Sequence, residues 1–502
     1  MSSFQKFITN IAWTTLGKTG VQVILFVVSI LLTRYLGKER LGDYATLLVI
    51  PVFARFLNSF GLETLINKKL PELNIGDPSG SEGRYLVGRL LAIRFMTTVC
   101  FCFLIYHFLP YYLDFIGYQW LIEFRWALIF YFFVITIDSI LSTLFMTLLR
   151  FKTLTKVETL GVLINLALLV LFIRLDHGIY GVLYAYIISA GITSVIYLSL
   201  ARGQFSGSVK KPEVGDMRHL AWVSYGISFL GFGLMMQSDV LLLNYFHVGR
   251  ADIGLYHLAT GLGGTMSFLL AGVAPMALSL FSETYTREGI KSLGNLYCQI
   301  VGFASYLTIP IFVFCVLNAS HVISFIYGST FLEGSQALVF YASFTGVQIA
   351  LGINFTVSSL YVIHRRDVVL RSTVEGSILN ILLNLILIPN FGMIGAITAT
   401  GVAMVYMVLR QLKKISTEMQ ITSTFPIMGQ CFLFCLISSI PPLILSWLHM
   451  GHLIINLLLY LITLIVLLVC VKPFKYEQRQ LITNVYPQLE PWAKWFFRSS
   501  KN

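Results

Sequence analysis

Long apolar runs, each about the length of a membrane span, follow one another along almost the whole chain. A helix that crosses a bilayer needs about 20 mostly apolar residues, so each break between runs marks the end of a span. The runs lie at residues 11–33, 43–62, 90–113, 124–149, 156–174, 178–200, 220–246, 252–280, 294–317, 334–362, 370–389, 392–412, 425–448 and 451–471. The pattern predicts an all-α polytopic membrane protein with about 14 transmembrane helices.

Two pairs of segments recur at nearly the same offset, which indicates an internal repeat. GIYGVLYAY at 178–186 resembles GMIGAITAT at 392–400, and RYLGKERLGDYATL at 34–47 resembles YFHVGRADIGLYHLAT at 245–260. Two parallel six-helix repeats are one architecture of secondary transporters. The predicted organisation is an N-terminal six-helix lobe at 1–205, a cytoplasmic linker at 206–219, a C-terminal six-helix lobe at 220–412, an extra helix pair at 413–471 and a cytoplasmic tail at 472–502.

Composition and charge agree with a membrane protein and predict its orientation. Hydrophobic residues make up 57% of the 502 and charged residues 12%, against about 25% charged in average soluble proteins. Most of the 35 Lys and Arg fall in loops that are cytoplasmic if the N-terminus is inside, where such residues are retained. We therefore expect a multi-pass membrane protein with both termini cytoplasmic. The net charge of +12 follows from this bias and requires no nucleic acid partner.

The motifs of soluble enzymes and nucleotide-driven pumps are missing from the sequence. The segment LGKTG at 16–20 resembles a phosphate-binding P-loop, but position 12, where that motif needs glycine, is alanine. We therefore expect no enzymatic activity, no catalytic residue and no cofactor, with transport driven by an ion gradient, the membrane potential or a downstream reaction. A membrane glycan polymerase or ligase remains an alternative, although such enzymes usually have a long external loop and the outside loops here are short.

Polar and ionisable residues inside the predicted spans are candidate functional residues, since a charge at a helix centre costs about 2.5–3.5 kcal/mol. Those in the N-terminal lobe are Lys18, Gln22, Arg55, Asn58, Arg94 and Asp138. Three of the four charges are positive, so we expect a cationic cavity that binds a phosphate or pyrophosphate through charge-assisted hydrogen bonds. In the alternative, Lys18 and Arg94 extend to the cytoplasmic interface and Asp138 merely pairs with an arginine.

Three segments, in order within residues 8–412, carry a family resemblance: TRYLGKERLGDYATLLVIPVFARFLNSFGLETLINKKLPE, SYGISFLGFGLMMQSDVLLLNYFHVGRADIGLYHLATGLGG and LNILLNLILIPNFGMIGAITATGVA. They resemble the polysaccharide or O-antigen (Wzx-type) flippases of the multidrug/oligosaccharidyl-lipid/polysaccharide (MOP) exporter superfamily. The resemblance implies a flippase that translocates a polyprenyl (undecaprenyl)-pyrophosphate-linked oligosaccharide by alternating access.

The resemblance also implies a biological setting. It places the protein in the bacterial cytoplasmic (inner) membrane, in the biosynthesis of O-antigen (lipopolysaccharide), capsule or exopolysaccharide. The lipid-linked oligosaccharide and membrane lipids are its expected partners. A polysaccharide polymerase and a chain-length regulator are further candidate partners. A cation-coupled multidrug exporter of the same superfamily remains an alternative, although its substrates are mostly cationic or amphipathic and the expected cavity is positive.

A second group of polar residues predicts a site for a coupling cation, sodium or a proton. Asn380 and Asn384 lie one helical turn apart, and Thr400 lies one turn after Ala396, whose carbonyl it could bond through its hydroxyl. Asp239 adds a carboxylate. Carboxylate, amide, hydroxyl and carbonyl oxygens are ligands for a hard cation such as sodium. In the alternative, the asparagines only hydrogen-bond neighbouring helices, which contributes about 0.6 kcal/mol per bond on average.

Overall fold

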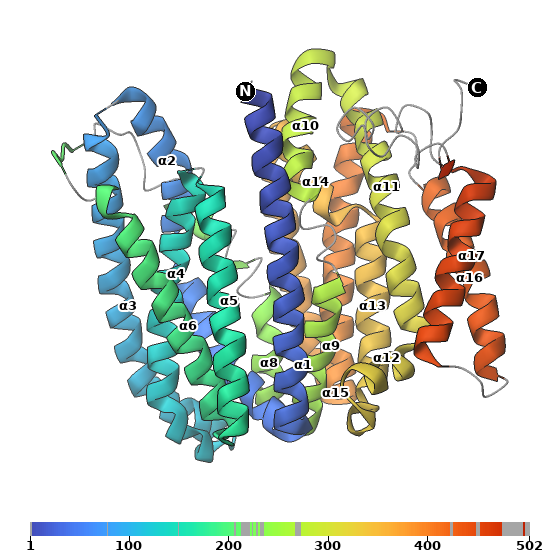
Figure 1. Cartoon of the computed structure of the whole chain (residues 1–502), viewed down its shortest axis with the longest axis horizontal. Helices are drawn as coiled ribbons and strands as arrows, with labels where there is room; N and C mark the ends of the chain where they lie inside the picture. Colours follow the sequence, from blue (N-terminus) through green and yellow to red (C-terminus); the bar gives the residue numbers. More distant parts are fainter. Residues whose placement is uncertain are drawn as a thin grey trace. The chain divides into compact units, whose positions relative to one another are not determined.

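The computed structural model describes residues 3–77, 79–148, 150–204, 207–211, 221–222, 224–226, 229–230, 235–266, 273–421, 425–447, 452–473 and 495–496. Within these ranges the regular elements are all helices (Figure 1), and ten helical stretches are long and apolar enough to cross a membrane. The predicted fold class, an all-α polytopic membrane protein, is confirmed. The total of about 14 spans stays a prediction, because parts of several predicted spans lie outside the described residues.

One compact unit comprises residues 1–265 and 373–400. Its elements are α1 (Ser3–Leu57), α2 (Leu62–Gly76), α3 (Ser81–Phe115), η1 (Gln119–Phe124), α4 (Arg125–Thr147), α5 (Phe151–Arg174), α6 (Gly178–Leu200), η2 (Arg202–Gln204), α8 (Met235–Tyr245), α9 (Arg250–Met266) and residues 373–400 of α15 (Arg366–Met419). Helix α4 packs against α3 and α6, and α6 packs against α5 (Figure 1). A buried apolar cluster that includes Ile66, Val87, Leu141 and Phe145 joins α2, α3 and α4.

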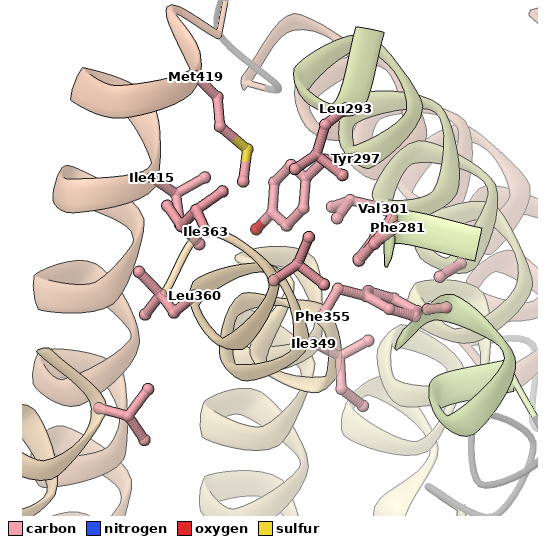
Figure 2. Packing of buried hydrophobic residues seen from close by; sticks show 14 of the residues in the cluster. Phe281, Leu293, Tyr297, Val301, Ile349, Phe355, Leu360, Ile363, Ile415 and Met419 are labelled. Atoms are coloured by element: carbon pink, nitrogen blue, oxygen red, sulfur yellow. The ribbon is translucent and has the colours of Figure 1, made fainter. Parts of the chain in front are cut away.

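The other compact unit comprises residues 266–372 and 401–502. Its elements are α10 (Val273–Glu288), α11 (Ile290–Leu317), α12 (Ala319–Ile326), η5 (Ser329–Phe331), α13 (Gly334–Ala350), α14 (Ile353–Val362), the two ends of α15 (366–372 and 401–419), α16 (Phe425–Trp447) and α17 (Leu453–Val471). Figure 2 shows its core, where Phe281, Tyr297, Phe355, Ile415 and Met419 converge from α10, α11, α14 and α15. Helices α16 and α17 pack together, and α16 packs on α11. The predicted six-helix lobes and the linker are continuous in the sequence, unlike these two units, and this division of the chain stays a prediction.

Two glycines interrupt the long helices at the breaks that the apolar pattern predicts. Gly37 in α1 has φ 71° and Gly392 in α15 has φ 53°, so neither backbone is helical there. These positive φ values favour glycine, because a side chain would strain the left-handed conformation. Gly37 lies in the predicted gap between 33 and 43, and Gly392 is the first residue of the span predicted at 392–412. Helices α1 and α15 therefore each consist of two helical segments that meet at the glycine.

The ends and continuity of two predicted spans differ in the structure. The span expected at 334–362 is a candidate membrane span with the same bounds, but Gly352, with φ 83°, divides it into α13 and α14. The span expected at 252–280 stays a prediction, because it includes residues outside the described ranges. The span expected at 43–62 ends at Leu57.

Helix α2 is absent from the predicted elements, and its residue pattern explains why. Leu62, Leu65, Ile66 and Leu70 are buried at helical spacing, whereas the opposite face carries Lys68 and other polar residues. This is the pattern of an amphipathic helix with one face on the protein. A search for uniformly apolar spans passes over such a helix.

Candidate substrate and cation sites

The carboxylate of Asp239, on α8, is buried and hydrogen-bonded on both oxygens. The side chain is 1% exposed. Its Oδ1 accepts a hydrogen bond from Asn384 Nδ2 at 2.8 Å, and its Oδ2 accepts bonds from Thr400 Oγ1 at 2.6 Å and Tyr256 Oη at 2.8 Å. Among the described residues, no Lys, Arg or His forms an ion pair with Asp239. Its negative charge is therefore balanced by neutral donors alone.

The two predicted asparagines extend this network along α15. Asn380 and Asn384 are both fully buried. Asn380 donates to Thr400 Oγ1 at 2.6 Å, and its Oδ1 accepts bonds from Ser238 at 3.2 Å and from Asn384 at 3.3 Å. Four of the five residues predicted to bind the cation thus form one connected network. The fifth, Ala396, is buried on the helical segment that carries Thr400.

The break in α15 brings these side chains together. After Gly392 the chain reverses, and Gly395 approaches the preceding segment so closely that a Cβ would lie 2.3 Å from the Leu387 carbonyl oxygen. Only a residue without a side chain allows this approach. Thr400 is consequently placed beside Asn380, although 20 residues separate them.

The network has the oxygen atoms that a hard cation requires. The buried Asn384 Oδ1 has no hydrogen-bond partner among the described residues, and an unpaired buried acceptor is costly unless a donor or an ion satisfies it. With the Asp239 carboxylate, it supplies the oxygen chemistry that sodium prefers. The Thr400 hydroxyl donates its single proton to Asp239 and not to the Ala396 carbonyl, so the expected back-bond is not formed. The described residues contain no group of three His, Cys, Asp or Glu that could hold a metal.

Arg94, on α3, is completely buried and already paired. Its guanidinium donates to the backbone carbonyl of Asn58 and to the carboxylate of Glu63 on α2. The Asn58 side chain donates to Thr98 Oγ1 at 3.0 Å. A buried arginine needs such a partner, because an unpaired buried charge is strongly destabilising. In this conformation Arg94 fixes α3 against the turn between α1 and α2, and it is not open to an anion.

Arg55, near the end of α1, lies in a different environment. It is half-buried, and its guanidinium carbon lies 5.4 Å from the centroid of the Phe56 ring. No carboxylate among the described residues is within ion-pair distance of it, although its charge acts on Asp138. Gln22 is also half-buried on α1, whereas the side chain of Lys18 lies outside the described residues. Arg55 is thus a cation without a paired carboxylate.

Asp138, on α4, is held by hydroxyl groups. Its Oδ1 accepts hydrogen bonds from Thr193 Oγ1 at 2.6 Å and from Ser194 Oγ at 3.4 Å, both on α6. The described residues include no ion pair between Asp138 and an arginine, which the alternative interpretation required. The carboxylate therefore links α4 to α6 and adds a negative charge near Arg55.

The structure also contains a close crossing of α1 and α9 that sequence reasoning missed. A Cβ on Gly42 would lie 1.9 Å from the Arg250 carbonyl oxygen, and one on Gly254 would lie 2.0 Å from that of Lys38. Beside the crossing, the Arg250 guanidinium donates to both carboxylate oxygens of Asp43, through Nε at 2.7 Å and through NH2. The repeat, which matches Gly42 with Gly254, singles out both glycines but does not show that they meet.

Five further residues of the networks around Asp239, Arg94 and Asp138 were not predicted: Tyr256, Ser238, Glu63, Thr193 and Ser194. Tyr256 belongs to the repeated motif, where it matches Tyr44, so the motif could have drawn attention to it. Ser238 and Glu63 carry no such signal. Their roles depend on how α8 faces α15 and on the existence of α2.

Comparison of the sequence with known proteins gives two matches. The profile of the family described as polysaccharide biosynthesis protein matches residues 30–336. The chain is also 23% identical over 269 residues to a protein of Haloferax volcanii described as the probable low-salt glycan biosynthesis flippase Agl15. That alignment covers 53% of this chain and 56% of the relative, so the chain spans about half the length of the curated relative it matches.

Comparison of the fold gives transporters of one superfamily. The lipid II flippase MurJ, in an inward closed conformation, superposes with a TM-score of 0.72 at 15% identity, covering 94% of this chain and 98% of that chain. An inward-facing multidrug resistance MATE family transporter of the MOP superfamily gives a TM-score of 0.66 at 16% identity, covering 82% of this chain and 100% of that chain. At these identities the likeness shows the fold alone.

Proposed function

The chain belongs to the polysaccharide biosynthesis protein family, within the MOP superfamily, and we therefore propose that it is a flippase for a polyprenyl-pyrophosphate-linked oligosaccharide. The proposal depends on the family match together with Arg55, which is a half-buried cation without a carboxylate partner in the described residues. The name of the curated relative, a probable glycan biosynthesis flippase, supports the same class of substrate.

In this proposal Arg55 binds the pyrophosphate group. A guanidinium offers two parallel donors to phosphate oxygens, which makes arginine well suited to this contact. Lys18 and Gln22, on the same helix, and Asn58, near its end, are further proposed contacts along the path of the head group. Arg94 contributes indirectly, because its pairing with Glu63 holds the end of α1 in place.

We propose that a sodium ion binds at the network of Asp239. The carboxylate of Asp239, the side-chain oxygens of Asn380, Asn384 and Thr400, and the carbonyl of Ala396 would hold it. When bound, the cation supplies the positive charge that the buried carboxylate lacks among the described residues. These residues connect α8 with both segments of α15 around Gly392. Protonation of Asp239, or binding of the cation, would therefore bias the packing of these helices.

The proposed setting is the cytoplasmic membrane of a bacterium, with both termini in the cytoplasm. The oligosaccharide would then serve O-antigen, capsule or exopolysaccharide biosynthesis, together with a polysaccharide polymerase and a chain-length regulator. The comparisons give flippases and transporters, so no enzymatic activity is proposed. The likeness to a multidrug transporter of the same superfamily favours drug export as the second candidate.

Reconstitution into liposomes tests the proposal. The probe is a fluorescent polyprenyl-pyrophosphate-linked oligosaccharide, whose exposure on the outer leaflet is followed by a membrane-impermeant quencher. We expect the wild-type protein to translocate it, Arg55→Ala to lose at least ten-fold in rate and Arg55→Lys to recover part of the rate, since a point charge replaces a bidentate fork. The control is Arg287→Ala, a solvent-exposed arginine of α10.

Two results would count against the proposal. Equal translocation by wild type and Arg55→Ala would remove Arg55 from the substrate site. Failure of the wild type to translocate the lipid-linked probe, together with gradient-driven export of a cationic dye, would favour the drug-export function.

A further inference from the structure

A pocket of about 530 Å³ lies at one end of the first unit, where α5 ends and α6 begins. It is distinct from the network of Asp239 and from Arg55. Five parts of the chain line it: the segment of α1 after Gly37, η1, the turn between α5 and α6, the start of α6, and the first residue of α9. The lining side chains used below are Arg40, Trp120, Glu123, Asp176, Tyr180 and Arg250.

The side chains of the pocket combine an aromatic surface with hydroxyl-binding groups. The Arg250 guanidinium carbon lies 5.0 Å from the centroid of the Trp120 ring, and the Tyr118 ring lies 5.1 Å from it. Trp120 is still 48% exposed, so the open part of its indole offers an apolar surface to a ligand. Glu123 and Asp176 are exposed carboxylates that accept hydrogen bonds, and Arg40 is an exposed donor. A sugar ring has a matching chemistry, because its C–H bonds form an apolar face and its hydroxyl groups lie around the rim.

The charge balance favours a neutral ligand over an anion. Arg250 is already neutralised by Asp43 through the paired hydrogen bonds of its guanidinium. Two further carboxylates then face the pocket, Glu123 and Asp176, against the single guanidinium of Arg40. A phosphate or acidic group would meet net negative charge, whereas sugar hydroxyls donate to carboxylates and accept from arginine.

The walls of the pocket are held in place before any ligand arrives. Tyr35 Oη donates to Asp176 Oδ1 at 2.9 Å and accepts from the backbone N–H of Gly178 at 2.8 Å. Tyr180 Oη donates to the Glu123 carbonyl at 2.9 Å, which ties α6 to η1. A site whose groups are already ordered loses less conformational freedom on binding. Its volume falls within the range of about 300–1,000 Å³ that is typical of small-ligand sites.

We propose that this pocket is a binding site for a neutral sugar ring, at the end of the protein where the oligosaccharide emerges. The exposed part of the Trp120 indole packs against the apolar face of the sugar, and Glu123, Asp176 and Arg40 bind its hydroxyls. The assignment to the emerging side rests on the proposed function, because both termini in the cytoplasm place the turn between α5 and α6 outside. The sugar specificity of the site itself rests only on its side chains.

Saturation-transfer NMR on the full-length protein in nanodiscs tests the site. The probes are neutral hexose and N-acetylhexosamine oligosaccharides, with a sialylated oligosaccharide as the acidic comparison. We expect neutral probes to bind the wild type, and both Trp120→Ala and Glu123→Gln to reduce the affinity at least ten-fold. Glu123→Gln keeps the side-chain volume, so it remains informative if Trp120→Ala folds poorly. The control is Trp447→Ala, a tryptophan that is 80% exposed and outside the pocket.

The outcomes separate this site from the proposed function. If no neutral probe binds the wild type, if neither variant weakens binding, or if only the sialylated probe binds, the sugar site is wrong, whatever the translocation assay shows. If neutral sugars bind as expected while the lipid-linked probe is not translocated, the pocket stands and the flippase function fails.

Discussion

Replacing Gly42 by alanine probes the crossing of α1 and α9 directly. The new Cβ would lie 1.9 Å from the Arg250 carbonyl oxygen, 2.8 Å from the carbonyl carbon and 3.2 Å from the Gly254 nitrogen. All three are backbone atoms of α9, so no side chain can rotate out of the way. The two helices must separate locally, and with them the paired hydrogen bonds between Asp43 and Arg250.

The size of the effect follows from the geometry. A real Cβ is not found closer than about 3.0 Å to such an atom, so the oxygen must retreat by roughly 1 Å or more. Overpacking of this kind costs about 1–3 kcal/mol. In a protein that exchanges between two states, the same energy shifts the equilibrium about 5- to 150-fold. Gly42→Ala should therefore depopulate any state that contains the crossing, while a state with the two helices apart is unaffected.

Spin-label distance measurement in nanodiscs reports this population. Labels at Glu39 on α1 and Gly249 before α9, in a background without the native cysteines, should give mostly a short distance in the wild type. Gly42→Ala should move most of the distribution to longer distances. The matched control is Gly20→Ala on the same helix, where a Cβ would meet nothing within 4 Å. If both alanine variants keep the wild-type distribution, the crossing does not hold the two helices together as argued.

The sequence was most informative where a single physical signal determines the outcome. Runs of apolar residues are required by the bilayer, and the breaks at Gly37 and Gly392 follow from the composition around them. The grouping of Asn380 and Asn384 near Thr400 could also be predicted from the sequence, because helical spacing places the two amides on one face. The repeat indicated that Gly42 and Gly254 are equivalent, but equivalence does not reveal that the two glycines meet.

Other features depend on packing that no local pattern encodes. Arg94 carries the same intramembrane signal as Arg55, yet the first is buried against Glu63 and the second has no paired carboxylate in the described residues. The difference arises from α2, an amphipathic helix whose mixed pattern does not resemble a span. The division of α13 from α14 at Gly352 was not predicted, because hydropathy averaged over a span is insensitive to one residue.

Three further predictions concern charged side chains. The hydroxyls of Ser79 and Ser81 and backbone N–H groups lower the pKa of Asp77 well below its usual value. Its stabilisation of the start of α3 is therefore present above the unfolded pKa of about 3.9 and is lost only as the pH falls through the lower folded value. The protection factors of the amides at 81–84, which are corrected for the intrinsic pH dependence of exchange, should be constant from pH 7 to about 4, and a loss of protection within that range would contradict this. Glu63→Gln leaves the guanidinium of Arg94 without its counter-charge, which should destabilise the protein by about 3 kcal/mol, seen as a lower melting temperature in detergent, whereas the exposed Glu288→Gln should match the wild type. Asp239→Asn keeps the shape of the side chain but removes the charge that a cation needs, while its new amide N–H can reach acceptors of the same network. Sodium, compared with choline at equal ionic strength, should raise the melting temperature of the wild type, because a ligand of the native state stabilises it by mass action. The variant should show no such rise, and its transport should no longer depend on sodium. An equal rise in both proteins would place the ion elsewhere and leave these residues as hydrogen bonds between helices.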